Sequence, residues 1–198
     1  MVRTLTPARP RDASHTRQEL LNAARVRFAR DGYRSTTVRD IATDAGVNVA
    51  LINRYFESKE RLFEACIARV GEELATPVEP ARTSEELARR LVVQIMGFSS
   101  EQGPAQLLLL LRRSGDERAD EIRRTILRSF AEKMAAIAGW TPDSDDRLLL
   151  RAEIIMAATL GIIQLRATSG VEPLGSADPE DLARPIEDMV VALLSTGS

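Results

Sequence analysis

The stretch Thr37–Phe56, TVRDIATDAGVNVALINRYF, decides the fold that we expect for this chain of 198 residues. Thr37 can accept a hydrogen bond from the backbone amide of Asp40 while the Asp40 carboxylate bonds back, a capping box that begins a helix. Gly46 ends that helix, because glycine readily takes the positive φ angle of a sharp reversal. Asn48 is a good N-cap for a second helix. Two short helices joined by a tight turn have the geometry of a helix-turn-helix.

The second helix of the pair has two faces of different character. At about 100° per residue, Ile52, Tyr55 and Phe56 share the packing face. The opposite face suits a major groove, because it combines small side chains with an amide that pairs with adenine and a guanidinium that serves guanine or a phosphate. These residues are Val49, Ala50, Asn53 and Arg54. The pattern leaves open an ordinary pair of surface helices.

Charge is unevenly distributed along the chain. Residues 1–70 carry 13 Arg and Lys against 8 Asp and Glu, a net charge of +5, whereas residues 71–198 carry 14 against 21, a net charge of −7. Basic charge therefore collects around the helix-turn-helix, as phosphate binding requires. A solvated surface could produce the same imbalance by chance.

The sequence disfavours enzymatic and metal-binding functions. Cys66 is the only cysteine, which excludes an intramolecular disulfide and a thiolate cluster for zinc. His15 is the only histidine and lies in the polar lead-in, where it is poorly placed for a Ser-His-Asp triad or a multi-histidine metal site. Catalysis by carboxylates alone stays formally open. We expect a protein that is not an enzyme and that needs no cofactor or metal.

Neither a signal peptide nor a membrane span is expected. The opening residues, MVRTLTP, lack an apolar core. The longest apolar stretches, Leu107–Leu111 and Ile154–Ile163, are shorter than a membrane span. The sequence therefore predicts a cytoplasmic protein with no membrane partner.

The spacing of apolar residues predicts an all-α protein in three parts. Residues 1–13 are expected to be a disordered N-terminal extension, with a minor-groove arm as the alternative. Residues 14–57 form the helix-turn-helix domain, which includes a bracing helix from Thr16 to Asp31. Residues 58–198 form a larger helical domain, and its first helix, over 58–74, connects the two domains.

Residues 32–67, GYRSTTVRDIATDAGVNVALINRYFESKERLFEACI, resemble the N-terminal domain of the TetR family of one-component transcriptional regulators. The segment 171–185, VEPLGSADPEDLARP, is similar to one found in actinobacterial-type members. The resemblance implies phosphate contacts by Thr36, Thr37, Tyr55 and Lys59. It implies major-groove contacts by Asn48, Val49, Ala50, Asn53 and Arg54.

The second helix departs from the family pattern. Many relatives carry Ser-Lys-Gly-Thr-Leu-Tyr where this chain has Asn-Val-Ala-Leu-Ile-Asn at 48–53. Val49 thus replaces a phosphate-contacting lysine, and Asn53 replaces the common tyrosine. The operator sequence therefore cannot be copied from a relative.

The resemblance also implies a homodimer, with residues 58–198 as the ligand-binding and dimerisation domain. Ala157 and Gly161 lie on one face of the penultimate helix and permit a close helix crossing. The last helix offers an apolar stripe, so that two helices from each copy could form a four-helix bundle. That stripe consists of Ile186, Met189, Val190 and Leu193. Alternatively, both helices use these residues to fill the intrachain core.

The remaining helices should enclose an effector pocket for a small, mainly apolar ligand with one or two polar anchors. The residues expected to line it are Leu91, Ile95, Met96, Leu107, Ile126, Phe130, Met156, Leu160 and Gln164. For each of them the alternative is ordinary core packing.

These features together predict a ligand-responsive DNA-binding regulator, in particular a repressor that a small effector releases from double-stranded operator DNA. Two recognition helices reach successive major grooves only when they are about 34–36 Å apart. A ligand that favours another spacing therefore weakens DNA binding, with the helix over 59–74 as the expected lever. The alternatives are an activator and a helical ligand-binding or adaptor protein without operator binding.

Overall fold

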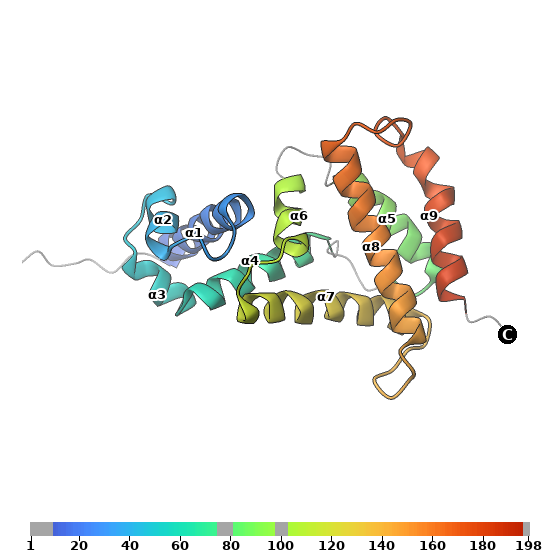
Figure 1. The fold of residues 1–198 in the computed structure, drawn as a ribbon, viewed down its shortest axis with the longest axis horizontal. Coiled ribbons are helices and arrows are strands. Elements are labelled where there is room, and N and C mark those ends of the chain that lie inside the picture. Colours follow the sequence, from blue (N-terminus) through green and yellow to red (C-terminus); the bar gives the residue numbers. More distant parts are fainter. Residues whose placement is uncertain (1–9, 75–80, 98–102, 196–198) are drawn as a thin grey trace, which may run out of the picture.

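In the computed structural model, which describes residues 10–74, 81–97 and 103–195, every regular element is a helix (Figure 1). The helices of these ranges are α1 (Pro10–Asp31), α2 (Val38–Asp44), α3 (Ala50–Phe56), α4 (Lys59–Leu74), α5 (Ser84–Gly97), α6 (Gly103–Leu111), α7 (Glu117–Ile137), α8 (Arg147–Thr168) and α9 (Pro179–Leu194). The predicted all-α fold is confirmed.

A long helix joins two groups of helices (Figure 1). The head consists of α1, α2, α3 and the loops between them, and the body consists of α5 to α9. α4 begins beside α3 and runs into the body, where it packs against α6 and α7. Within the body α5 lies along α9, and α8 contacts α5, α6, α7 and α9. The helix that leaves the DNA-binding end is thus in direct contact with the body.

The head is held together by an apolar stripe on α1. Leu20, Ala24 and Phe28 are buried and are spaced one helical turn apart. They belong to the same buried cluster as Ile41 of α2 and Ile52 of α3. α1 therefore braces the other two helices, as predicted.

α1 begins earlier than expected. The sequence predicted a start at Thr16, but the helix begins at Pro10 and runs through Thr16 without a break. Residues 10–13, expected to be disordered, are therefore helical. Proline is tolerated in the first turn of a helix, because the amide that it lacks would have no intrahelical partner there. Residues 1–9 of the predicted extension lie outside the described ranges.

α8 corrects the expectation that no segment reaches the length of a membrane span. By length and composition alone, Arg147–Thr168 is apolar enough to cross a membrane. In the fold it is a helix of the bundle, with Ala152, Ile155 and Ile163 buried inside the chain. Its outer face is apolar as well, which is why its composition resembles that of a span.

Candidate DNA-binding site and effector region

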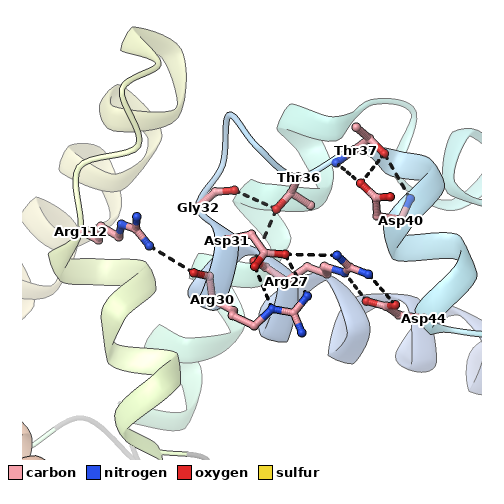
Figure 2. A network of polar contacts seen from close by, with 9 residues as sticks. All are labelled: Arg27, Arg30, Asp31, Gly32, Thr36, Thr37, Asp40, Asp44 and Arg112. Carbon is pink, nitrogen blue, oxygen red and sulfur yellow. Dashed lines mark hydrogen bonds and ion pairs between the residues drawn. The ribbon is translucent and has the colours of Figure 1, made fainter.

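Arg27 holds α2 against α1 (Figure 2). Its guanidinium donates to both carboxylate oxygens of Asp44, with Nη2 2.9 Å from Oδ1, and to Asp31 at 3.2 Å. Hydrogen bonds from Arg27 lower the pKa of Asp44, and those from Arg30 and Arg27 lower the pKa of Asp31 to about 2. The bidentate pair fixes the two helices in one orientation. The sequence did not predict the ion pair between Arg27 and Asp44, because the two residues are 17 positions apart and no helical spacing relates them.

The N-terminus of α2 is capped as predicted, whereas Thr36 is not placed as expected. Thr37 Oγ1 accepts from the Asp40 amide at 3.2 Å, and Asp40 Oδ2 accepts from the Thr37 amide at 3.1 Å. The Thr37 hydroxyl also donates to Asp40 Oδ2 at 2.6 Å, and this bond lowers the pKa of Asp40. Thr36 is buried, and its hydroxyl donates to the Gly32 carbonyl at 2.8 Å. The expected phosphate contact of Thr36 does not fit this position, because the hydroxyl closes the loop between α1 and α2.

α3 presents the predicted reading face. Gly46 has a φ angle of +65°, and the amide of Ala50 donates to Asn48 Oδ1 at 2.8 Å, so that the turn and the helix start are built as expected. Ile52 and Phe56 are buried against the head. The side chains of the opposite face are exposed, namely Val49, Ala50, Asn53 and Arg54.

Lys59 is the first residue of α4, and the Tyr33 ring holds its side chain in place. Its Nζ lies 4.2 Å from the centre of the Tyr33 ring, a cation–π contact, and burial lowers the pKa of Lys59. The Tyr33 hydroxyl donates to Glu60 Oε1 at 3.1 Å, which holds the ring in place. The amide of Arg61 donates to Ser58 Oγ at 3.2 Å, so that Ser58 caps α4. The ammonium group therefore lies at a helix N-terminus, which favours a phosphate.

The head carries further aromatic and basic groups outside the reading face. Tyr55 is half-buried, and the guanidinium carbon of Arg54 lies 5.8 Å from the centre of its ring. Arg17, from α1, lies with its guanidinium carbon 4.8 Å from the centre of the Phe56 ring. Arg39 is exposed on α2. Sequence analysis did not single out Arg17 or Arg39, because an exposed arginine on a helix has no distinguishing pattern.

Two sequence profiles match this chain. The profile of the bacterial regulatory proteins, tetR family, covers residues 20–66, and that of the Tetracyclin repressor-like C-terminal domain covers residues 85–194. The chain belongs to the TetR family. It is a DNA-binding transcriptional regulator and not an enzyme.

Curated members of the TetR family match over part of the chain. The HTH-type transcriptional dual regulator CecR of Shigella flexneri is 36% identical over 88 residues, which are 44% of this chain and 38% of that protein. The HTH-type transcriptional repressor KstR2 of Mycolicibacterium smegmatis is 40% identical over 60 residues, which are 30% of this chain and 29% of that protein. The chain thus spans well under half the length of these curated relatives.

Solved structures match over nearly the whole chain. A TetR-family regulator from Streptomyces coelicolor A3 is 26% identical with a TM-score of 0.58, and the match covers 96% of this chain and 99% of that chain. The SmeT-triclosan complex is 21% identical with a TM-score of 0.65, and the match covers 90% of each chain. The second likeness shows the fold alone.

Seven of the residues predicted to line a TetR-type effector pocket belong to the apolar core that runs through the head and the body. The buried members are Leu91, Ile95, Leu107 and Leu160. The half-buried members packed against them are Met96, Ile126 and Met156. Gln164 also reaches inward, since its Oε1 is buried and has no hydrogen-bond partner in the part of the chain that the structure describes. These residues come from α5, α6, α7 and α8, and their role as the lining of a ligand pocket stays a prediction.

A groove of about 440 Å³ lies between α4 and α7. It is lined by Ser58, Glu60, Arg61, Glu64, Arg118 and Ile122. None of the residues predicted to line the effector pocket belongs to this groove. Phe130, one of those residues, instead packs on the backbone of Gly71 in α4.

The structure buries part of the predicted dimer surface and leaves the rest at least partly exposed. Ile186 and Val190 are buried inside the chain, where α9 packs along α5, so that they are not available to a second copy. An apolar stripe in the sequence does not reveal whether it packs inside the chain or against a second copy. Here Ile186 and Val190 pack inside the chain. Met189 and Leu193 are half-buried at the edge of the intrachain core.

α8 keeps an open apolar face. Ala157 is exposed, and a Cβ built on Gly161 would have no heavy atom within 4 Å. Leu150, Ile154 and Leu165 continue this face at helical spacing and are 57%, 46% and 43% exposed. We call these five residues the α8 stripe.

Proposed function

We propose that this TetR-family regulator is a cytoplasmic repressor that binds double-stranded operator DNA as a homodimer and leaves it when a small, mainly apolar effector binds. The observation that supports operator binding best is the exposed face of α3. Its small, amide and guanidinium side chains lie together, with the buried Ile52 and Phe56 behind them. Such a face fits a major groove.

Each exposed group has a distinct role in this proposal. The amide of Asn53 pairs with adenine, and Arg54 reaches guanine or a phosphate. Close approach to the groove is allowed by Asn48, Val49 and Ala50. The phosphate backbone is held by Thr37, Tyr55 and Lys59.

The α8 stripe supports dimerisation. Small residues at its centre, Ala157 and Gly161, allow two copies of α8 to cross closely, and larger apolar side chains flank them on the same face. Packing two stripes together removes an apolar surface from water. Met189 and Leu193 of α9 border the same interface and complete the four-helix bundle.

One similar protein is named a repressor, and one protein of the same fold is solved with a small molecule. SmeT is solved with triclosan, KstR2 is named a repressor, and CecR is named a dual regulator. The buried, unpartnered Oε1 of Gln164 supplies one polar acceptor beside an apolar cluster, as an apolar ligand with one donor group requires. An activator is the alternative for the sign of regulation. An adaptor without operator binding would have no need for the exposed reading face.

The effector acts by shifting populations. α4 contacts α3 at its start and α6 and α7 in the body, so that a ligand that prefers another arrangement of the body changes the position of the head. The spacing of the two reading helices then departs from the value of about 34–36 Å that successive grooves require.

The test is selection of bound duplexes from random DNA by mobility shift. A repressor dimer enriches one two-fold symmetric site, and transcription from that site falls when the protein is added. Small apolar compounds are then screened for release of the selected duplex. Enrichment of no duplex favours the adaptor, and increased transcription favours the activator.

A further inference from the structure

The turn between α6 and α7 lies against the head. Arg112, just after α6, donates from Nη1 to the backbone carbonyl of Arg30 at 3.3 Å, in the last turn of α1 (Figure 2). The same guanidinium lies beside Gly32, because a Cβ built there would be 3.8 Å from Arg112 Cζ. Arg112 thus caps the end of α1, where free carbonyls and the helix dipole favour a cation.

The same turn approaches the head a second time at Gly115. This residue has a φ angle of +73°, and a Cβ built on it would lie 3.1 Å from Cδ of Arg34. Arg34 belongs to the loop between α1 and α2, just before the Thr37 cap. The turn therefore contacts the end of α1 and lies close to the loop that leads into the helix-turn-helix.

Buried polar contacts make this turn rigid. Asp120 Oδ1 accepts from the amide and from the hydroxyl of Ser114, both at 2.8 Å. Arg123 is buried, pairs with Asp120 and donates to the Leu109 carbonyl of α6 at 2.8 Å. Its guanidinium carbon also lies 5.7 Å from the centre of the Phe63 ring of α4. The turn therefore moves together with the end of α6 and the start of α7.

We propose that the turn over residues 112–116 is a positioning element in which Arg112 and Gly115 set the angle of the head, and that this angle selects operators by the distance between their half-sites. The head meets the body through α4 and also where α1 packs against α6. The turn after α6 extends this contact to the end of α1 and to the loop before α2, which restricts rotation of the head, so that a dimer accepts only a narrow range of groove spacings. The inference rests on the proposed dimeric operator binding.

Head motion is measured directly in the full chain by pulsed electron spin resonance. Spin labels are placed at Glu19→Cys on α1 and Ala136→Cys on α7, two exposed positions, while the native Cys66 is buried. Dilution with unlabelled protein removes distances between copies. Arg112→Ala should broaden the distance distribution, and Gly115→Ala should shift it by pushing on Arg34.

Two matched controls accompany these variants. Arg113→Ala removes the same charge from an exposed neighbour in the same turn and should leave the distribution unchanged. Gly139→Ala adds a methyl group at a φ angle of +89°, where a Cβ would meet nothing within 4 Å, and so reproduces the backbone strain without the contact.

Spacing selectivity is the functional readout. The operator selected from random DNA is compared with versions that carry one or two extra base pairs between the half-sites. Loss of the Arg112 hydrogen bond should reduce the preference for the selected spacing by about three- to tenfold. Both controls should keep the preference for the selected spacing.

Unchanged distance distributions and unchanged spacing preference in Arg112→Ala and Gly115→Ala would overturn the inference. A parent chain that enriches no duplex contradicts the proposed function instead, and the spin-label distances then decide whether the turn holds the head.

Discussion

Gly71 of α4 and Phe130 of α7 touch where the two helices cross, since a Cβ built on Gly71 would lie 2.1 Å from Phe130 Cζ. At this point only a residue without a side chain lets the ring lie on the backbone of α4. Lys59 stands at the other end of the same helix. The crossing therefore joins the packing of the body to the helix that carries a proposed phosphate contact.

Gly71→Ala should destabilise the protein. The added methyl group forces the Phe130 ring away, and such overpacking costs about 1–3 kcal/mol. The better helix propensity of alanine returns only roughly 0.5–1 kcal/mol. Urea unfolding should therefore show a lower free energy of unfolding than in the parent. Gly97→Ala is the control, because a Cβ at Gly97 would meet nothing within 4 Å and should cost no stability.

A double-mutant cycle identifies the cause of that loss. In a Phe130→Leu background the ring is absent, so Gly71→Ala should cost less than it does in the parent. Equal costs in both backgrounds would show that Phe130 is not what excludes a side chain at residue 71.

Local chemistry made much of the head predictable. The Thr37 and Asp40 capping box, the positive φ angle of Gly46 and the faces of α3 depend only on residues within one or two helical turns. Such short-range rules are visible in a sequence. The hydroxyl of Thr36 could not be placed in this way, because its bond to the Gly32 carbonyl depends on how the loop closes.

Contacts between distant segments were not predictable. The bond from Arg112 to the Arg30 carbonyl joins two helix ends from different domains, and neither residue type nor spacing indicates it. The apolar stripe of α9 was visible in the sequence, but the sequence did not show that the stripe packs against α5 of the same chain. Ile186 and Val190 face the intrachain core, whereas α8 keeps the exposed stripe.

Arg54→Ala and Lys59→Ala should weaken operator binding in different ways. Loss of a base contact at Arg54 should cost about 1–3 kcal/mol, mainly for the selected operator. Loss of a phosphate contact at Lys59 should weaken all duplexes alike and reduce the salt dependence by about one ion. Titrations at several salt concentrations measure both effects. Arg89→Ala, at an exposed position on α5, controls for lost charge. Unchanged binding in both head variants would contradict the docking proposal.

Gly161→Leu should disrupt the homodimer. A bulky side chain at a close crossing of two α8 helices forces them apart, and overpacking alone costs roughly 1–3 kcal/mol. Ile154→Arg should act similarly by placing a charge in the α8 stripe. Sedimentation velocity at micromolar concentration gives the oligomeric state, with Val93→Arg, 60% exposed on α5, as the control. A Gly161→Leu protein that stays dimeric with parental stability would place the interface on another surface.

Asp120→Asn should change how stability depends on pH. Burial by itself raises the pKa of Asp120, but hydrogen bonds from Ser114 and Arg123 outweigh it and lower that pKa from 3.8 to about 2. A carboxyl group with a lowered folded-state pKa stabilises the fold above its unfolded pKa. This contribution, roughly 2 kcal/mol, is lost as the pH falls from about 4 to about 2. Urea unfolding at a series of pH values should therefore show the variant less stable than the parent at neutral pH, with the difference shrinking in acid.

Asp143→Asn, at an exposed loop position, should follow the parent at every pH. A constant difference between Asp120→Asn and the parent down to about pH 2 would mean that ionisation of Asp120 does not stabilise the turn.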